Sequence, residues 1–253
     1  MRIRAFAVVM FSVFFLMLSA ACVTAPVEQG GGAAAVGRSF DMHMKQGQDF
    51  LSRKDYGRAA AEFQAAVALK PDSARAHNDL GLCYFHQRDY DPAAEQFEKA
   101  VALDPSYATA FNNLAGSYSM KLRFPAAEEA YKKALSLSPD MISANYSLGI
   151  LLTNLVRKDE GAVYLARGIA LDPDFLERHR EMITQYSSLF FDMKEAYFVY
   201  AGAYASAGNV EKTLGYLVRA KEAGFTDWQR VLRDKEFEKV RDDPRIKKFL
   251  SGD

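Results

Sequence analysis

The stretch from His77 to Pro105 reads HNDLGLCYFHQRDYDPAAEQFEKAVALDP, and its small, aromatic and proline positions recur on both sides of it at a constant spacing. Six columns keep this register over four repeats: Pro71, Pro105, Pro139 and Pro173; Gly47, Gly81, Ala115 and Gly149; Phe50, Tyr84, Tyr118 and Leu152; Ala59, Ala93, Ala127 and Gly161; Phe63, Phe97, Tyr131 and Leu165; and Ala66, Ala100, Ala134 and Gly168. A fixed period of about 34 residues indicates one helix–turn–helix unit copied along residues 40–175.

The columns have a physical role in the packing of two antiparallel helices. The small residues Gly81, Ala93 and Ala100 let the helices approach closely, and a large side chain there would cost about 1–3 kcal/mol in overpacking. The aromatic residues Tyr84 and Phe97 fill the space beside them. Because one pair of helices cannot bury its own apolar face, the sequence predicts that neighbouring pairs stack.

The period and the residue types resemble those of the tetratricopeptide repeat (TPR) family, strongly over residues 40–175 and weakly over most of the remainder. The resemblance implies an all-α fold: a TPR α–α superhelix, or solenoid, of about five helix–turn–helix repeats plus C-terminal capping helices. It also implies a protein that binds other proteins and is not an enzyme.

The repeat pattern weakens toward the C-terminus. Gly161 and Gly168 stand where alanine is expected inside a helix, and each should cost about 1 kcal/mol of helix propensity. The register breaks after the last proline of the series, which predicts an irregular helical insert over residues 176–193. The pattern returns as a degenerate fifth repeat over residues 194–225, and residues 226–253 predict a cap whose aromatic side chains cover the last apolar face.

Residues 1–21 have the three-part layout of a secretory signal peptide. A basic head with Arg2 and Arg4 precedes an uncharged apolar run from Ala5 to Leu18, and small residues follow it. This run is short for a membrane span, which needs about 20 apolar residues. A signal anchor is the alternative interpretation.

The stretch Leu18-Ser-Ala-Ala-Cys22 resembles the lipobox of bacterial lipoproteins, in which the thiol takes a diacylglycerol and cleavage leaves the cysteine first. The family prefers leucine three residues before the cysteine, where this sequence has Ser19. Ordinary cleavage after Ala21 or Ala25 is the alternative. The resemblance implies that Cys22 is lipidated and joins the protein to a membrane.

The residues after this cysteine predict a tether and a location. Val23, rather than aspartate, follows the cysteine, which resembles lipoproteins sorted to the outer membrane and facing the periplasm. Residues 22–38 contain three consecutive glycines and no periodic apolar face, so they predict a flexible tether with a reach of about 20–25 Å.

Composition argues against several other functions. The chain has 32 basic and 32 acidic residues, and loss of residues 1–21 would leave a net charge of −2. Nucleic-acid binding needs a concentrated basic patch, so no nucleic-acid partner is expected. The four histidines lack the spacing of a zinc helix and Cys83 has no neighbouring base, so the sequence predicts no metal, no cofactor and no catalytic residue.

An enzyme or an enzyme accessory is the alternative in a different class. Its site would lie in the predicted insert, where Glu177, His179, Arg180 and Glu181 stand together in the sequence. On one helix these side chains point mostly in different directions, which argues against this hypothesis.

The TPR resemblance assigns the first helix of each repeat to the concave wall of the superhelix. The residues of this wall predict a partner groove: Gln48, Asn78, Leu82, Phe85, His86, Asn112, Asn113, Tyr146, Ile150 and Asn154. Its amides can hydrogen-bond the backbone of an extended peptide, and Phe85 and Tyr146 can accept apolar side chains. Asn113 resembles one rung of the asparagine ladder of peptide-tracking TPR superhelices, and the positions of a carboxylate clamp lack its basic residues.

Together these features predict a membrane-tethered, periplasm-facing adaptor that holds a protein or an extended peptide in its groove. Two roles of TPR lipoproteins fit, and no residue separates them. Pilotins help type IV pilus secretin subunits to assemble in the outer membrane, and other adaptors recruit peptidoglycan hydrolases. A regulator of polysaccharide export is a further alternative.

Overall fold

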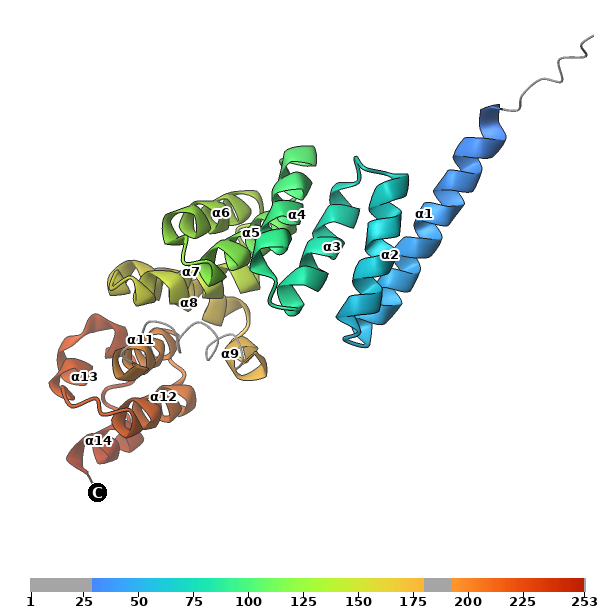
Figure 1. Ribbon diagram of the computed structural model, residues 1–253. Helices are drawn as coiled ribbons and strands as arrows, with labels where there is room; N and C mark the ends of the chain where they lie inside the picture. Colours follow the sequence, from blue (N-terminus) through green and yellow to red (C-terminus); the bar gives the residue numbers. More distant parts are fainter. Residues whose placement is uncertain (1–28, 180–192, 253) are drawn as a thin grey trace, which may run out of the picture.

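The computed structural model describes residues 29–179 and 193–252, and the regular structure of these residues is entirely helical (Figure 1). The paired helices are α1 (Gln29–Ser52), α2 (Tyr56–Leu69), α3 (Ala74–His86), α4 (Tyr90–Leu103), α5 (Ala108–Met120), α6 (Phe124–Leu137), α7 (Ile142–Asn154), α8 (Lys158–Leu171), α11 (Met193–Ser206) and α12 (Val210–Glu222). The others are α9 (Phe175–Arg178), α13 (Gln229–Arg233), the 3-10 helix η1 (Lys235–Phe237) and α14 (Pro244–Ser251).

Consecutive helices pack in pairs, and neighbouring pairs stack along the molecule (Figure 1). The contacts are densest within the pairs α1–α2, α3–α4, α5–α6, α7–α8 and α11–α12, and weaker contacts join one pair to the next. The predicted all-α superhelix of helix pairs is therefore confirmed.

The turn inside each of these pairs contains one residue with a left-handed backbone. Lys54, Arg88, Leu122 and Val156 have φ angles of 60°, 68°, 60° and 62°, and Gly208 takes the same place in the α11–α12 turn with φ of 75°. This conformation costs about 1–2 kcal/mol for a residue with a Cβ. Of these turns, only that of α11–α12 uses glycine, the residue that adopts the conformation without strain.

In the first two pairs, a glycine of the first helix makes room for an aromatic ring of the second. A Cβ added to Gly47 would lie 2.6 Å from the Phe63 ring, and one added to Gly81 would lie 2.7 Å from the Phe97 ring. Both rings are fully buried. The small and aromatic columns of the sequence thus form one packing contact that is repeated along the chain.

The fourth pair, α7 and α8, brings backbone against backbone. A Cβ added to Gly161 would lie 2.8 Å from the carbonyl oxygen of Gly149 and 2.5 Å from Thr153 Oγ1. A Cβ added to Gly168 would lie 2.9 Å from the Tyr146 ring. The glycines that weaken the repeat pattern are therefore the residues that permit this close approach.

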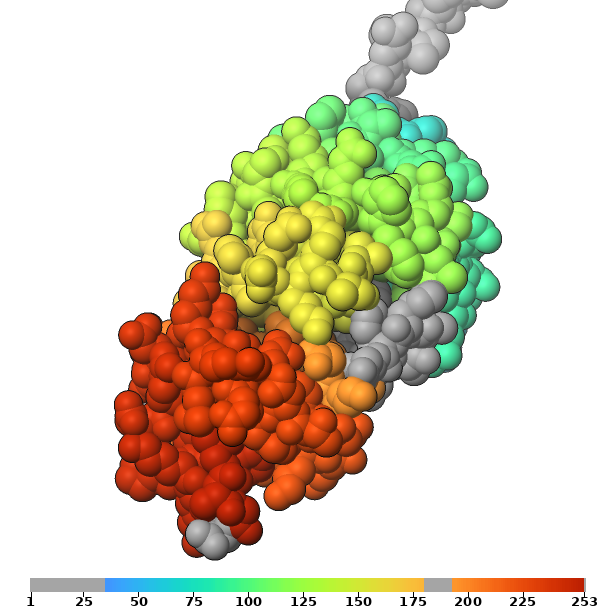
Figure 2. Space-filling view, turned by 90° about the vertical axis from the view of Figure 1, so that its left-hand side faces the viewer, coloured from blue at the N-terminus to red at the C-terminus, as the bar shows by residue number. Residues whose placement is uncertain are grey.

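The buried side chains form three small clusters in the early repeats and one long cluster beyond them. The small clusters lie along α1–α3, α3–α5 and α5–α8. The long cluster extends from α7 to α14 and contains the buried Tyr146, Tyr200, Tyr204 and Tyr216. Figure 2 shows the orange and red C-terminal helices packed as one mass against the yellow α8.

The predicted flexible tether is wrong for residues 29–38, because α1 begins at Gln29. Three alanines, Ala33 to Ala35, follow the glycines, and alanine has the highest helix propensity, so the first helix continues toward the N-terminus. The predicted signal peptide, Cys22 and residues 23–28 lie outside the described residues, as do residues 180–192 of the predicted insert.

Candidate functional site

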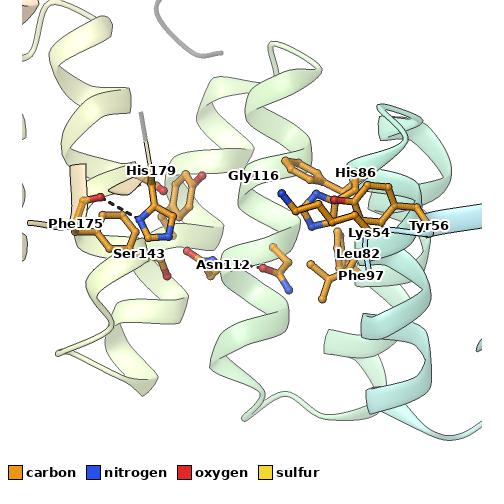
Figure 3. A pocket seen from close by; sticks show the side chains of 14 residues that line it. Lys54, Tyr56, Leu82, His86, Phe97, Asn112, Gly116, Ser143, Phe175 and His179 are labelled. Atoms are coloured by element: carbon orange, nitrogen blue, oxygen red, sulfur yellow. Dashed lines mark hydrogen bonds between the residues drawn. The ribbon is translucent and has the colours of Figure 1, made fainter. Parts of the chain in front are cut away.

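A groove of about 690 Å³ lies on the face that α3, α5 and α7 share (Figure 3). These helices contribute Leu82, Phe85, His86, Asn112, Asn113, Gly116, Ser143 and Ser147 to its lining. The α1–α2 turn, the start of α2 and the α9 region close its two ends, and Phe97 and Tyr131 contribute from α4 and α6. We call this hollow the concave groove.

Stacked rings form both end walls of the concave groove. At one end, the Tyr56 and His86 rings stack with their centroids 4.7 Å apart, and Lys54 lies beside them (Figure 3). At the other end, His179 stacks on Phe175 at 4.2 Å, and Phe175 stacks on the buried Tyr146 at 4.9 Å. Each wall therefore presents a flat ring held in place by a second ring.

A chain of oriented side-chain amides runs along the floor. Asn113 Nδ2 donates to Asn78 Oδ1 at 2.9 Å, and Asn78 Nδ2 donates to Asp79 Oδ1 at 3.1 Å. Asn112 Nδ2 lies 3.4 Å from Asn113 Oδ1. Each amide in the chain donates from its NH₂ group to the neighbour on the Asp79 side. The oxygen at the opposite end of the chain, Asn112 Oδ1, therefore receives no hydrogen bond from another amide, and it is buried without a partner among the described residues.

His86 in the groove lining and Asp79 beneath it have shifted pKa values. Burial raises the pKa of the Asp79 carboxyl, against the opposing effects of Asn78, Arg75 and Gln48. Burial, and then the nearby Lys54 ammonium, lower the pKa of His86. At neutral pH the His86 ring is therefore uncharged, and Lys54 supplies the fixed positive charge at this end.

Comparison with known proteins places this geometry in a known fold. Residues 44–108 match the family model of the tetratricopeptide repeat, and no curated protein matches the chain. A crystal structure of MamA aligns with a TM-score of 0.53 at 20% identity, covering 79% of this chain and 97% of that one. TTC0263 from Thermus thermophilus aligns with a TM-score of 0.52 at 19% identity, covering 77% and 96%, respectively. The fold is a TPR solenoid.

A third structure of this kind is YrrB, described as a TPR protein with an unusual peptide-binding site. It aligns with a TM-score of 0.50 at 21% identity, covering 81% of this chain and 99% of YrrB. At these identities the likeness concerns the fold alone.

Half of the predicted groove residues line the concave groove of the TPR solenoid: Leu82, Phe85, His86, Asn112 and Asn113. Asn78 lies beneath them as a buried member of the amide chain. Gln48 lines a separate hollow of about 210 Å³ between α1 and the start of α3. Asn154 lies near the end of α7, outside the groove, and its buried Oδ1 has no partner among the described residues.

The prediction was wrong for Tyr146 and Ile150, which are buried in the long C-terminal cluster. The face of α7 that should have been open is covered because α9 and α11 pack against it. The Tyr146 hydroxyl donates to the Asp172 carbonyl oxygen at 2.8 Å, so even its polar atom has an internal partner.

Sequence reasoning missed the residues that close the two ends. Lys54, Tyr56, Phe175 and His179 lie outside α3, α5 and α7, and the groove was predicted from the first helices of the repeats alone. Ser147 could have been found, because it lies one repeat period after Asn113 on the corresponding face.

The alternative site in the predicted insert is not assembled by the described residues. The Glu177 carboxylate oxygen Oε2 lies 3.4 Å from Lys212 Nζ and forms an ion pair with it. His179, by contrast, lines the concave groove. Arg180 and Glu181 lie outside the described residues. Among the residues that are described, no group of three or more His, Cys, Asp or Glu side chains is arranged to hold a metal ion.

Proposed function

We propose that the chain is a membrane-tethered scaffold on the periplasmic side of a bacterial outer membrane, and that it holds an extended segment of a partner protein in the concave groove. The TPR fold supports a role in protein–protein interaction. YrrB, which has the same fold, is described as having a peptide-binding site. The envelope location rests on the sequence of residues 1–23.

The observation that carries the binding proposal is the unpartnered oxygen of Asn112. A buried acceptor without a donor costs about 1–3 kcal/mol. Asn112 itself is half-buried, so a small rotation of its amide toward the groove lets a ligand donate a hydrogen bond to this oxygen and recover the energy. The backbone N–H groups of an extended peptide are such donors whatever the side chains are. The rings at both ends can pack against the side chains of the same peptide.

Filling the groove tests this proposal. Ser143→Trp places a large uncharged side chain in the groove, and Ser136→Trp places the same side chain on the exposed surface of α6 as a matched control. The native protein and Ser136→Trp should recover the same partner from solubilised envelopes, and Ser143→Trp should not. Equal recovery by both variants, or no partner above background with the native protein, would contradict the proposal.

The tether has a separate test. No helix in the described part of the chain combines the length and the apolar character needed to cross a membrane. Cys22→Ser should release the protein into the soluble periplasmic fraction and abolish acyl labelling. Acyl labelling that persists in this variant would show that Cys22 is not the anchor.

The most specific part of the proposal is the envelope pathway in which the scaffold acts. A tethered peptide-binding groove suits assistance to a type IV pilus secretin, recruitment of peptidoglycan hydrolases and regulation of polysaccharide export. The recovered partner distinguishes them directly. Neighbouring genes for a secretin, a wall hydrolase or glycosyltransferases would each favour a different pathway.

A further inference from the structure

We propose that the segment held in the concave groove is acidic and aromatic: a carboxylate pairs with Lys54 at one end, and an aromatic ring stacks on His179 at the other. This inference rests on the proposed function and gives the groove a specificity. It depends on the charge of the lining, on the hydrogen-bonding state of His179 and on the position of Asn112 between the two ends.

The described part of the groove lining is positively charged. None of the described side chains that line it is a carboxylate, and the Lys54 ammonium is the one fixed charge among them. Lys54 forms no ion pair with any residue that the structure describes. By contrast, Lys121 and Lys212, which lie elsewhere on the solenoid, pair with Asp91 and Asp174. A carboxylate on the ligand supplies the negative charge that would pair with Lys54.

The His179 wall offers a ring face and an acceptor. His179 Nδ1 lies 3.0 Å from the Phe175 carbonyl oxygen, and because a carbonyl only accepts, this nitrogen carries the proton. In the neutral ring Nε2 is then an acceptor, like Asn112 Oδ1 on the floor. Phe175 supports the ring from one side, and no second ring among the described residues stacks on its other face, which can therefore stack with an aromatic side chain of the ligand.

The distance between the ends sets the length of the segment. The groove spans the successive first helices α3, α5 and α7, and packed helices are about 8–10 Å apart. Two such steps correspond to about six residues of extended chain at about 3.3 Å per residue. Lys54 and His179 lie beyond α3 and α7, so a peptide of eight residues, about 26 Å long when extended, reaches past these helices toward both ends.

A random library of eight-residue peptides, displayed on phage and selected on the full-length protein in detergent, tests the specificity. The native protein should enrich peptides that carry aspartate or glutamate together with an aromatic residue. Selected peptides with no preference for acidic residues would overturn the inference and leave the proposed function standing. Failure to select any peptide would overturn both.

Charge reversal at Lys54 sharpens the test. Lys54→Glu should abolish the acidic preference and weaken binding of the selected acidic peptide about fivefold to tenfold. Arg53→Glu is the matched control, because it makes the same charge change at the neighbouring exposed residue outside the groove, and it should bind like the native protein. Lys54→Gly removes the charge at a backbone conformation that glycine prefers, and it should also lose the acidic preference.

The aromatic contact has its own variant. His179→Ala should lower the enrichment of aromatic residues and keep the enrichment of acidic ones. His43→Ala, which removes a ring from α1 outside the groove, should change neither. An acidic preference that survives in both Lys54→Glu and Lys54→Gly, or an aromatic preference that survives in His179→Ala, would overturn the assignment of these residues.

Discussion

In the α1–α2 and α3–α4 pairs a glycine faces an aromatic ring, whereas in the α7–α8 pair Gly149 and Gly161 bring two backbones together. The early repeats also keep separate clusters of buried side chains, and the chain from α7 to α14 shares one. A packing defect should therefore stay within one pair near the N-terminus and spread through several helices near the C-terminus.

The groove lies where these two regions meet. Its floor of asparagines comes from the early repeats, and its His179 wall is fixed by Phe175 and Tyr146, which belong to the C-terminal cluster. The difference between the regions thus has a functional consequence: the repeats supply a regular surface, and the break in the repeat closes it at one end.

The largest expected effect is the loss of a cap aromatic. Phe237 is 1% exposed and its ring centroid lies 5.2 Å from that of Phe198 in α11. Phe237→Ala should lower the free energy of unfolding by about 3–5 kcal/mol and accelerate amide exchange throughout α11–α14. Phe97→Ala should cost a similar amount, with faster exchange confined to α3–α5. Exchange that stays local in both variants would disprove the single C-terminal cluster.

A smaller effect is expected at the close approach of α7 and α8. Gly161→Ala should destabilise the protein by about 1–3 kcal/mol in guanidinium unfolding, because the new Cβ meets backbone atoms that cannot rotate away. Gly215→Ala in α12 is the control: nothing lies within 4 Å of its added Cβ, so it should stabilise the helix by about 0.5–1 kcal/mol. Stabilisation by both changes would mean that the two backbones are not in contact.

Valine and glycine can be exchanged between equivalent turns of the two regions. Val156 is 77% exposed and has φ of 62°, so Val156→Gly should raise the free energy of unfolding by about 1 kcal/mol. Gly208→Val, at the equivalent turn of the fifth pair, should lower it by about 1–2 kcal/mol. Changes of the same sign in the two variants would show that the turns are not equivalent.

The smallest expected effect concerns the Cys83 thiol in the early repeats, which should not react while the protein is folded. Burial, and then the Asp79 carboxylate, raise the pKa of the Cys83 thiol to about 12. At pH 8 only about one thiol in ten thousand is then ionised, so Cys83 in a Cys22→Ser protein should not react with a disulfide reagent until guanidinium is added. Rapid stoichiometric labelling of the folded protein would contradict the tight packing of this cluster.

Much of the fold is predictable because the repeat period encodes contacts within a pair of helices. Gly81 and Phe97 form in the structure the notch that their columns indicate. Gly161 and Gly168 depart visibly from the alanine columns, but helix propensity alone does not reveal that they face Gly149 and Tyr146. The start of α1 is hard to predict because the three glycines of residues 30–32 disfavour a helix, whereas the three alanines that follow them favour one.

The groove was harder to predict because it depends on contacts between pairs. Asn112, Asn113 and His86 follow from the register of the first helices, and they line the groove. Tyr146 has an equivalent register position, but α9 and α11 pack over it and bury it. The repeat pattern does not encode the packing of these two helices. Lys54 reaches the groove from a turn and His179 from the residues after Pro173, so neither belongs to the first helices from which the groove is predicted.

Site-specific photo-crosslinking in living cells tests the central claim most directly. A photoreactive residue at Ser143, inside the groove, should join the protein to one defined partner, and the same residue at Val163, which is 67% exposed on α8, should not. Mass spectrometry of the Ser143 product should place the crosslink in an acidic, aromatic segment of that partner. Equal crosslinking from both positions, or crosslinking from Val163 alone, would contradict the account.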